Sequence, residues 1–360
     1  MPKRNEIKQV SAGDHPVFLG DGVLDALASL VKARKGDVYV LCDRNTAAHC
    51  LPELLGALEG LAPVSTMEVE PGEGSKSLET GRGLWDHLLQ HEADRHTLLI
   101  NLGGGVITDL GGFVAGTYKR GIDCVHVPTT LMGMCDAAIG GKNGIDLGGV
   151  KNAVGLIRGP LGVYVHPPFL RTLGKRELLN GAAEMMKHGL ALDARHWNDL
   201  EDAPLHDLDA LAGLIARSVE LKAAVVSADQ RESGERKKLN FGHTFGHALE
   251  AHSWESGQRE LLHGEAVALG MIAEAWLSWR MKAIGRDELE AITARLLALY
   301  KPYPLMASDH HRLLQLMRND KKNSSGTFRC TLLERIGSAQ VDVEVSATLM
   351  SEAIDHLRHL

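Results

Sequence analysis

The sequence predicts an α/β domain over residues 1–175, followed by an all-α domain over residues 176–360. In the first part, buried strand-like segments alternate with segments of helical period, which is typical of a parallel sheet covered by helices. From about residue 175, nearly every segment carries apolar residues at the 3.6-residue period of a helix. No low-complexity linker separates the two parts, so we expect two tightly packed domains with a cleft between them.

The individual elements follow from local patterns. Short apolar runs predict three strands of the sheet, at residues 37–43, 97–102 and 124–128. Apolar spacings of three and four predict helices at residues 49–60 and 77–92 in the first domain, and at 175–192, 207–229, 240–253, 263–283 and 286–299 in the second. A strand at 327–333 and a helix at 345–359 close the chain. The glycine-rich segment 136–152 lacks a helical period and is predicted to be a long functional loop.

Composition and charge exclude several classes of protein. With 44% hydrophobic and 24% charged residues, the chain is neither disordered, collagen-like nor a disulfide framework. Its net charge of −7 gives no electrostatic reason to expect a nucleic acid or an anionic membrane as partner. The five cysteines are widely spaced without a CxxC pair, so we expect reduced thiols and a cytoplasmic protein. We find no signal-peptide core and no apolar run of the roughly 20 residues that a membrane span needs.

A glycine triplet follows the second predicted strand and opens a helix. Gly103, Gly104 and Gly105 would let the backbone approach a pyrophosphate, whose charge is favoured at a helix N-terminus. The spacing is a variant of GxGxxG, and it predicts nucleotide binding over the alternative of a tight turn without ligand. Residues 71–77 form a second polar glycine loop, for which N-capping of the next helix is an equally good explanation.

Histidine and carboxylate side chains indicate a metal site. His243 and His247 are four residues apart on one helical face, and His263 opens a later helix beside Glu265. Imidazoles with a carboxylate suit zinc, and the spacing alone selects His243 with His247 as ligands, although such pairs also occur without a metal. Glu184 is three residues from a lysine, either as a solvated ion pair or as a ligand carboxylate beside a substrate-binding ammonium. The small apolar neighbours favour the second interpretation.

Basic side chains recur in apolar or glycine-rich surroundings. Each alone is typical of a surface charge, but gathered in a cleft they would bind a phosphate and a carboxylate by charge-assisted hydrogen bonds. These cations are Lys142, Lys151, Lys187, Lys222, Arg236, Lys321 and Lys322.

Several sequence blocks, in this order and spacing, resemble the 3-dehydroquinate synthase family of sugar phosphate cyclases over nearly the whole chain. They are GGGV at 103–106 with Asp109, RGI at 120–122, PTTL at 128–131, GGK at 140–142, GAAEMMK at 181–187, LNFGHTFGH at 239–247 and LHGE at 262–265. The resemblance implies a Rossmann-like N-terminal domain for NAD and a helical C-terminal domain for one divalent metal ion, zinc or cobalt, in a dehydroquinate synthase-like fold. It also implies a homodimer with the active site in the cleft.

The resemblance also implies a role for individual residues. The metal ligands would be Glu184, His243 and His263, with His247 facing the substrate instead of the metal. The NAD-binding positions would be Asp43, Asn45, Glu73, Lys76, Gly103, Gly104, Gly105, Val106, Asp109, Thr129, Thr130, Lys142 and Lys151. The substrate-binding positions would be Asp136, Lys142, Lys151, Asn152, Lys187, Lys222, Arg236, Asn240, His247 and Lys321 or Lys322, with Arg120 reaching the substrate phosphate from the partner subunit. Of these, Lys142, Lys187, Arg236, Asn240 and His247 would be catalytic.

The implied reaction converts 3-deoxy-D-arabino-heptulosonate 7-phosphate to 3-dehydroquinate and phosphate, a lyase step of the shikimate pathway to chorismate and the aromatic amino acids. It would proceed by transient oxidation by NAD at C5, β-elimination of phosphate, return of the hydride, ring opening and an intramolecular aldol closure.

The chain departs from the family pattern within residues 134–146. Ala137 and Ala138 stand where relatives commonly have serines, Asn143 replaces a threonine, and Asp146 replaces an asparagine. These departures leave open a related cyclase that acts on sedoheptulose 7-phosphate or another sugar phosphate. A metal-dependent polyol or alcohol dehydrogenase would share the glycine loop and the metal domain, but the many cations argue against an uncharged substrate. A non-catalytic binding protein of the same fold is disfavoured by the retained ligand residues.

Overall fold

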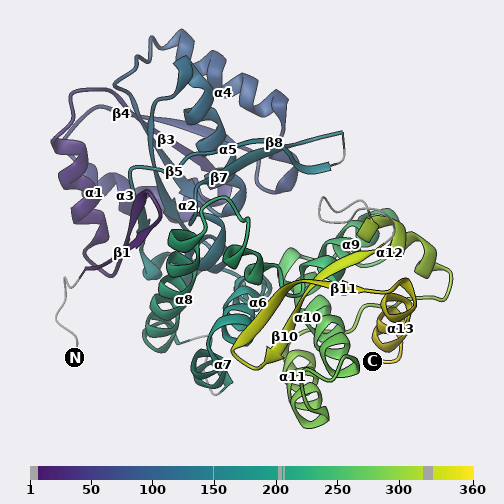
Figure 1. The fold of residues 1–360 in the computed structure, drawn as a ribbon. Helices are drawn as coiled ribbons and strands as arrows, with labels where there is room; N and C mark the ends of the chain where they lie inside the picture. The colour runs from purple at the N-terminus through teal and green to yellow at the C-terminus, as the bar shows by residue number, and fades with distance from the viewer. Residues whose placement is uncertain (1–6, 149, 202–204, 206, 319–326) are drawn as a thin grey trace. The chain divides into compact units, whose positions relative to one another are not determined.

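The structure, a computed structural model, describes residues 7–148, 150–201, 205, 207–318 and 327–360 (Figure 1). Contacts between Cα atoms divide it into two compact units, one of Met1–Leu178 with Leu205–Gln230 and one of Leu179–Pro204 with Arg231–Leu360. Helix α8 (Leu208–Ala228), which the sequence pattern assigns to the second domain, packs in the first unit against β1 (Lys8–Ala12). The division at residue 175 therefore remains a prediction for the functional domains.

A seven-stranded sheet forms the centre of the first unit within the described residues, in the order β1-β2-β9-β6-β5-β3-β4. All neighbouring pairs are parallel except β1 with β2, so the predicted parallel sheet is confirmed. The strands after β1 are β2 (His15–Leu19), β3 (Val38–Asp43), β4 (Val64–Val69), β5 (Leu98–Gly103), β6 (Asp123–Pro128) and β9 (Val163–Val165). The predicted strands at 37–43, 97–102 and 124–128 are β3, β5 and β6.

Helices cover both faces of this sheet, with α1 and α3 on one side and α4 and α5 on the other (Figure 1). Alternate residues of the strands, such as Tyr39, Leu41 and Leu99, belong to one buried cluster with residues of α4 and α5. The residues on one face of the strands pack here against the apolar stripes of the two helices, as the two sequence periods predict. The helices and helical turns of this unit are α1 (Val23–Lys32), α2 (Arg44–His49), α3 (Leu51–Leu58), η1 (Glu73–Ser75), α4 (Leu78–Gln90), α5 (Gly105–Thr117), η2 (Tyr118–Arg120), η3 (Gly133–Ala137) and η4 (Pro167–Thr172).

The prediction of a long loop over residues 136–152 was wrong. The segment begins inside a π-helical turn, η3. An antiparallel hairpin of β7 (Lys142–Leu147) and β8 (Val150–Ile157) follows. Left-handed backbone at Gly140 and Gly141, with φ of +107° and +68°, joins the turn to the hairpin. The sequence did not predict β8 because this strand is exposed or half-buried along its whole length. Its residues therefore do not alternate between apolar and polar as those of a half-buried strand do.

The second unit consists mainly of helices, with a single described hairpin of β10 (Phe328–Arg335) and β11 (Ser338–Val345). Its helices are α6 (Lys175–Leu192), α7 (Ala194–Glu201), η5 (Glu235–Asn240), α9 (His243–Glu255), α10 (His263–Arg280), α11 (Arg286–Leu299), α12 (Asp309–Arg318) and α13 (Ala347–Arg358). The helix predicted from residue 240 begins only at His243, because Gly242 before it adopts a left-handed φ of +81°. Helix α10 is buried along most of its length, and α9 packs against it.

None of the helices in the described ranges combines the length and the apolarity that a membrane crossing needs. All five cysteines are buried, and none of them forms a disulfide within the described residues.

Two glycines are expected to respond to alanine in opposite directions. A Cβ at Gly270 in α10 would lie 1.9 Å from the carbonyl oxygen of Gly242, a backbone atom that cannot swing away. A Cβ at Gly213, in the exposed interior of α8, would meet nothing within 4 Å. Urea unfolding should show Gly270→Ala losing about 3 kcal/mol through overpacking, whereas Gly213→Ala gains up to about 1 kcal/mol of helix propensity. Equal stability of the two variants would contradict this account of α9–α10 packing.

Candidate active site

The carboxyl ends of the parallel strands carry residues predicted to bind a dinucleotide. β4 lies on one side of β3 and β5 on the other, so the chain reverses its direction of winding between β3 and β5. Ligands of open α/β sheets bind outside the strand ends at such a switch point. Asp43 ends β3, Gly103 ends β5, and Thr129 follows β6, where its N–H donates to the carbonyl of Gly103 at 3.0 Å. Asn45 lies in α2 and Val106 in α5.

The glycine turn fits a pyrophosphate. A Cβ at Gly104 would lie 3.0 Å from the side chain of Thr130, and one at Gly105 would lie 3.1 Å from Ala137, so the turn has little room for larger residues. Helix α5 starts here without a side-chain cap, which leaves its N-terminus suited to an anion. The hydroxyl of Thr129 is buried and has no hydrogen-bond partner among the described residues. These observations fit NAD bound with its phosphates against this turn.

A buried ion pair stands beside the turn. Lys76 Nζ lies 2.6 Å from Asp109 Oδ2. Burial opposes the charge on the amine, but the carboxylates of Asp109, Glu73 and Asp146 together outweigh burial and raise the pKa of Lys76 above its ordinary value. Glu73, in η1, lies 3.5 Å from Lys151 Nζ. The capping alternative for this segment also holds, because the side chain of Ser77 caps α4.

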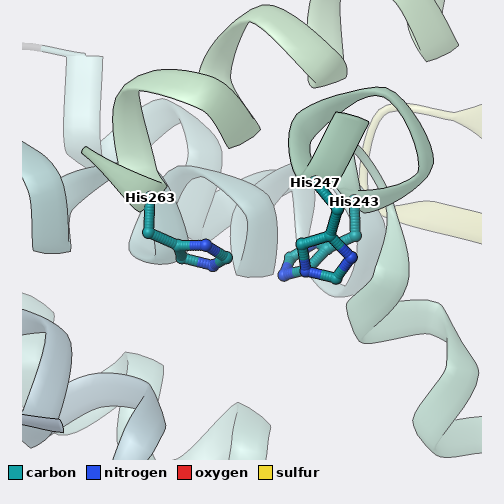
Figure 2. A group of neighbouring side chains, drawn as sticks. All are labelled: His243, His247 and His263. Atoms are coloured by element: carbon teal, nitrogen blue, oxygen red, sulfur yellow. The ribbon is translucent and has the colours of Figure 1, made fainter. Parts of the chain in front are cut away.

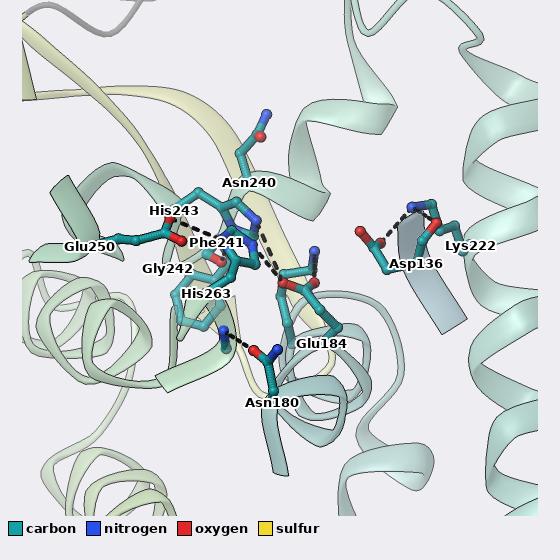
Figure 3. Close-up of polar contacts among 12 residues, drawn as sticks. Asp136, Asn180, Glu184, Lys222, Asn240, Phe241, Gly242, His243, Glu250 and His263 are labelled. Carbon is teal, nitrogen blue, oxygen red and sulfur yellow. Dashed lines mark hydrogen bonds and ion pairs between the residues drawn. The ribbon is translucent and has the colours of Figure 1, made fainter. Parts of the chain in front are cut away.

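Predicted substrate residues of the first unit lie on η3, the hairpin and α8. Lys222 is buried and donates to the carbonyl and the Oδ1 of Asp136, at 2.6 and 2.5 Å (Figure 3). Asn152 has a left-handed φ of +50° and donates its N–H to Asp146 Oδ1 at 2.7 Å. Lys142 is exposed at the start of β7, and Arg120 is exposed at the end of η2.

In the second unit, Glu184 brings two distant imidazoles together (Figure 3). Its Oε1 lies 3.6 Å from Nε2 of His243 and 3.5 Å from Nε2 of His263. Ligands at about 2.1 Å from a tetrahedral zinc ion are separated from each other by about 3.4 Å, so the Glu184 oxygen has the spacing of a fellow ligand to each of the two histidine nitrogens. Glu184 is fully buried on α6, while the histidines begin α9 and α10.

A third imidazole points into the same space (Figure 2). Ligand nitrogens of His243, His247 and His263 all lie within 4.8 Å of one another. The geometry therefore admits both ligand sets, the one from helical spacing that includes His247 and the one from the resemblance that includes Glu184.

Hydrogen bonds to the far nitrogen orient the rings of His243 and His263, which belong to both ligand sets. His243 Nδ1 lies 3.2 Å from the carbonyl of Phe241, and His263 Nδ1 lies 3.2 Å from Glu250 Oε2. Metal-binding histidines typically donate a hydrogen bond from their second ring nitrogen to a carbonyl or carboxylate in this way. Both rings then present Nε2 toward Glu184.

The surroundings shift the pKa values of the two histidines in opposite directions. Burial first, then the positive charge of Lys187, hold the pKa of His243 well below its ordinary value, so its nitrogen is neutral. At His263 burial acts against the charged form, but Glu250 and Glu184 outweigh it and raise the pKa to about 10. Lys187 is buried and pairs with Glu184, so the interpretation of these two residues as a solvated ion pair was wrong.

The remaining residues predicted to bind substrate in the second unit lie on η5 or outside the residues that the structure describes. Arg236 is buried, and Asn240 Nδ2 donates to Glu232 Oε1 at 2.6 Å. Lys321 and Lys322 lie outside the described residues.

The sequence patterns missed several carboxylates and amides that hold these elements. Asn180 accepts from the N–H of Gly264, next to His263, at 2.6 Å, while Glu250 and Glu274 are buried acceptors on α9 and α10. A single carboxylate inside an otherwise apolar helical stripe is the signal that could have marked Glu274.

A glycine turn at the switch point of a parallel sheet and a Glu–His–His cluster on helices define an enzyme with a dehydroquinate synthase-like fold. Family models described as 3-dehydroquinate synthase N-terminal and C-terminal match residues 66–180 and 181–323. The chain belongs to the 3-dehydroquinate synthase family, and the resemblance seen in the sequence is confirmed.

Curated relatives match nearly the full chain. A 3-dehydroquinate synthase from Parabacteroides distasonis is 37% identical over 93% of this chain and 94% of its own length. Another, from Halorhodospira halophila, is 38% identical over 98% of this chain and 99% of its own.

Solved structures of other synthases share the fold. A 2-deoxy-scyllo-inosose synthase complexed with carbaglucose-6-phosphate, NAD+ and Co2+ has a TM-score of 0.86 and 26% identity, covering 98% of this chain and 100% of that one. A 2-epi-5-epi-valiolone synthase from Streptomyces hygroscopicus with NAD+ and Zn2+ bound has a TM-score of 0.84 and 28% identity, covering 99% of each chain.

Proposed function

We propose that this chain is a 3-dehydroquinate synthase that releases phosphate from 3-deoxy-D-arabino-heptulosonate 7-phosphate and forms 3-dehydroquinate. The observation that carries the proposal is the convergence of Glu184 Oε1 with the Nε2 atoms of His243 and His263. Family membership supports the activity, and the curated relatives at 37% and 38% identity carry its name.

Two groups have sites of suitable chemistry. Glu184, His243 and His263 would hold a divalent metal ion, zinc or cobalt, and the strand ends with the glycine turn would hold NAD. When bound, the metal would lower the pKa of substrate hydroxyls, and NAD would supply reversible hydride transfer at the C5 carbinol.

The chain's own side chains bind and orient the anionic substrate. Lys142, Lys187, Arg236 and the partner's Arg120 would hold its phosphate and carboxylate by charge-assisted hydrogen bonds. Asn240 and His247 would position the leaving phosphate, whose own oxygen can accept the proton that elimination releases. Lys151, Asn152, Lys222, Asp136 and Lys321 or Lys322 complete the proposed substrate set.

The residues that depart from the family pattern support the hairpin. Asn143 Nδ2 donates to the carbonyls of Gly141 and Arg158, at 3.0 and 2.9 Å. Asp146 accepts from the N–H of Asn152. Both replacements therefore brace residues next to, or within, the proposed substrate set.

We further propose a cytoplasmic homodimer. The hairpin exposes apolar side chains, with Leu147, Val150 and Ile157 each more than half exposed at 52%, 56% and 52%. Exposed apolar side chains at both ends of this hairpin are suited to contact with a second copy of the chain. Gly121, which follows Arg120, closely approaches the side chain of Arg158 at the end of this hairpin, so Arg120 adjoins the proposed contact.

Phosphate release from each candidate sugar phosphate tests the activity. The NAD- and metal-loaded enzyme should release phosphate from the heptulosonate phosphate without net accumulation of NADH, because the hydride returns within each turnover. Turnover of sedoheptulose 7-phosphate alone would reject the proposed substrate. Steady accumulation of NADH would indicate a dehydrogenase instead.

A further inference from the structure

One buried carboxylate accepts hydrogen bonds from the backbone on both sides of a proposed metal ligand. Glu274, on α10, is fully buried. Its Oε2 accepts from the N–H of Gly242 at 2.6 Å, and its Oε1 accepts from the N–H of Thr244 at 3.1 Å. Gly242 and Thr244 are the residues directly before and after His243.

These bonds replace a cap that the helix itself lacks. α9 begins at His243, and its N-cap Gly242 has no side chain to satisfy the first N–H groups. A carboxylate is well suited to this position because the N-terminus of a helix carries partial positive charge and N–H bonds to a carboxylate are strong.

Close backbone packing directs Glu274 to this place. Gly270, one helical turn before Glu274, leaves room for the carbonyl of Gly242, since a Cβ there would lie 1.9 Å from that oxygen. Gly246 similarly packs against Val267, with a Cβ distance of 3.1 Å to the Cα of Val267. The two helices therefore meet almost without intervening side chains, and Glu274 fixes how α9 is turned about its own axis.

We propose that Glu274 is a positioning residue that sets the direction of the His243 imidazole and so tunes the affinity of the metal site. This inference rests on the proposed function, because that proposal makes His243 a ligand. Residues that orient a metal ligand typically change metal affinity by about 10- to 100-fold when replaced.

The test compares two glutamines that each weaken a helix cap. Glu274→Gln keeps the side-chain size but replaces one acceptor oxygen with an NH2 group. Glu288→Gln makes the same change at the start of α11, where Glu288 Oε2 accepts from Gly285 N–H at 2.9 Å and no proposed ligand is near in sequence. For both variants and the unaltered chain we would measure Co2+ affinity by competition with a chelator, the visible absorption spectrum of bound Co2+, and urea stability without metal.

We expect Glu274→Gln to bind Co2+ about 10- to 100-fold more weakly, with a changed spectrum, and Glu288→Gln to match the unaltered chain. Unaltered affinity and spectrum in Glu274→Gln would overturn the inference, as would an equal loss in Glu288→Gln. If Glu274→Gln does not fold, Glu274→Asp, which withdraws the carboxylate by one methylene, is measured instead, and unaltered binding there overturns the inference. Absence of Co2+ binding by the unaltered chain would reject the proposed function itself.

Discussion

Replacing Glu184 with alanine should cost the protein its metal and nearly all of its activity. The change removes the single carboxylate that faces both Nε2 atoms and leaves two imidazoles, one of them neutral and buried. Loss of a residue that merely orients a ligand costs about 10- to 100-fold in affinity or activity, so loss of a ligand should exceed about 100-fold. Metal analysis of the purified variant and an assay of phosphate release measure both effects.

A matched control lies on the same helix. Glu177 occupies the first turn of α6, so Glu177→Ala also removes a carboxylate from this helix while leaving the histidine cluster intact. It should retain metal and activity. Unchanged metal content in Glu184→Ala would reject the ligand set of Glu184, His243 and His263 and favour the three-imidazole set.

Replacing His247 with alanine should separate activity from metal binding. His247 is exposed at its position on α9, and its ring lies 5.1 Å from that of His243 and 5.8 Å from that of His263, between centroids. If it contacts the leaving phosphate, its loss removes a hydrogen bond to a charged group, and phosphate release should fall by about 10- to 100-fold. Metal content should stay at the level of the unaltered protein.

His243→Ala provides the comparison for His247→Ala. Because Nδ1 of His243 donates a hydrogen bond to a carbonyl and Nε2 faces Glu184, the His243→Ala variant should lose metal and activity together. Parallel loss of metal in both variants would make His247 a ligand, and the substrate role proposed for it would then fail.

The parts of the fold that sequence patterns predicted are those with strong local periodicity. β3 is an apolar run up to its last residue, β5 is apolar apart from Asn101, and α6 was predicted with its observed bounds. The hairpin of β7 and β8 could not be read this way, because β8 shows no alternation and only Ile145 and Leu156 of the described hairpin residues join the core cluster of the first unit. The stripe on α8 predicts a helix but cannot say which unit it packs against.

In the site, too, sequence patterns predicted features made of neighbouring residues and missed those made of residues far apart in the chain. The glycine turn was predicted because its function depends on consecutive residues. Helical spacing selected His243 with His247, yet the carboxylate that faces His243 comes from α6, and only the resemblance pointed to Glu184. Glu250 and Glu274 escaped both approaches, because their importance lies in hydrogen bonds to residues 13 and about 30 positions away.

The placement of α8 has a consequence for biosynthesis. Because the first compact unit includes Leu205–Gln230, its chain is interrupted by Leu179–Pro204, which belongs to the second unit. A nascent polypeptide that has emerged only as far as residue 178 therefore lacks the helix that packs on β1 and whose Ser227 hydroxyl accepts from the N–H of Gly13 at 2.9 Å. The first unit therefore cannot acquire all of its contacts until synthesis has passed residue 230.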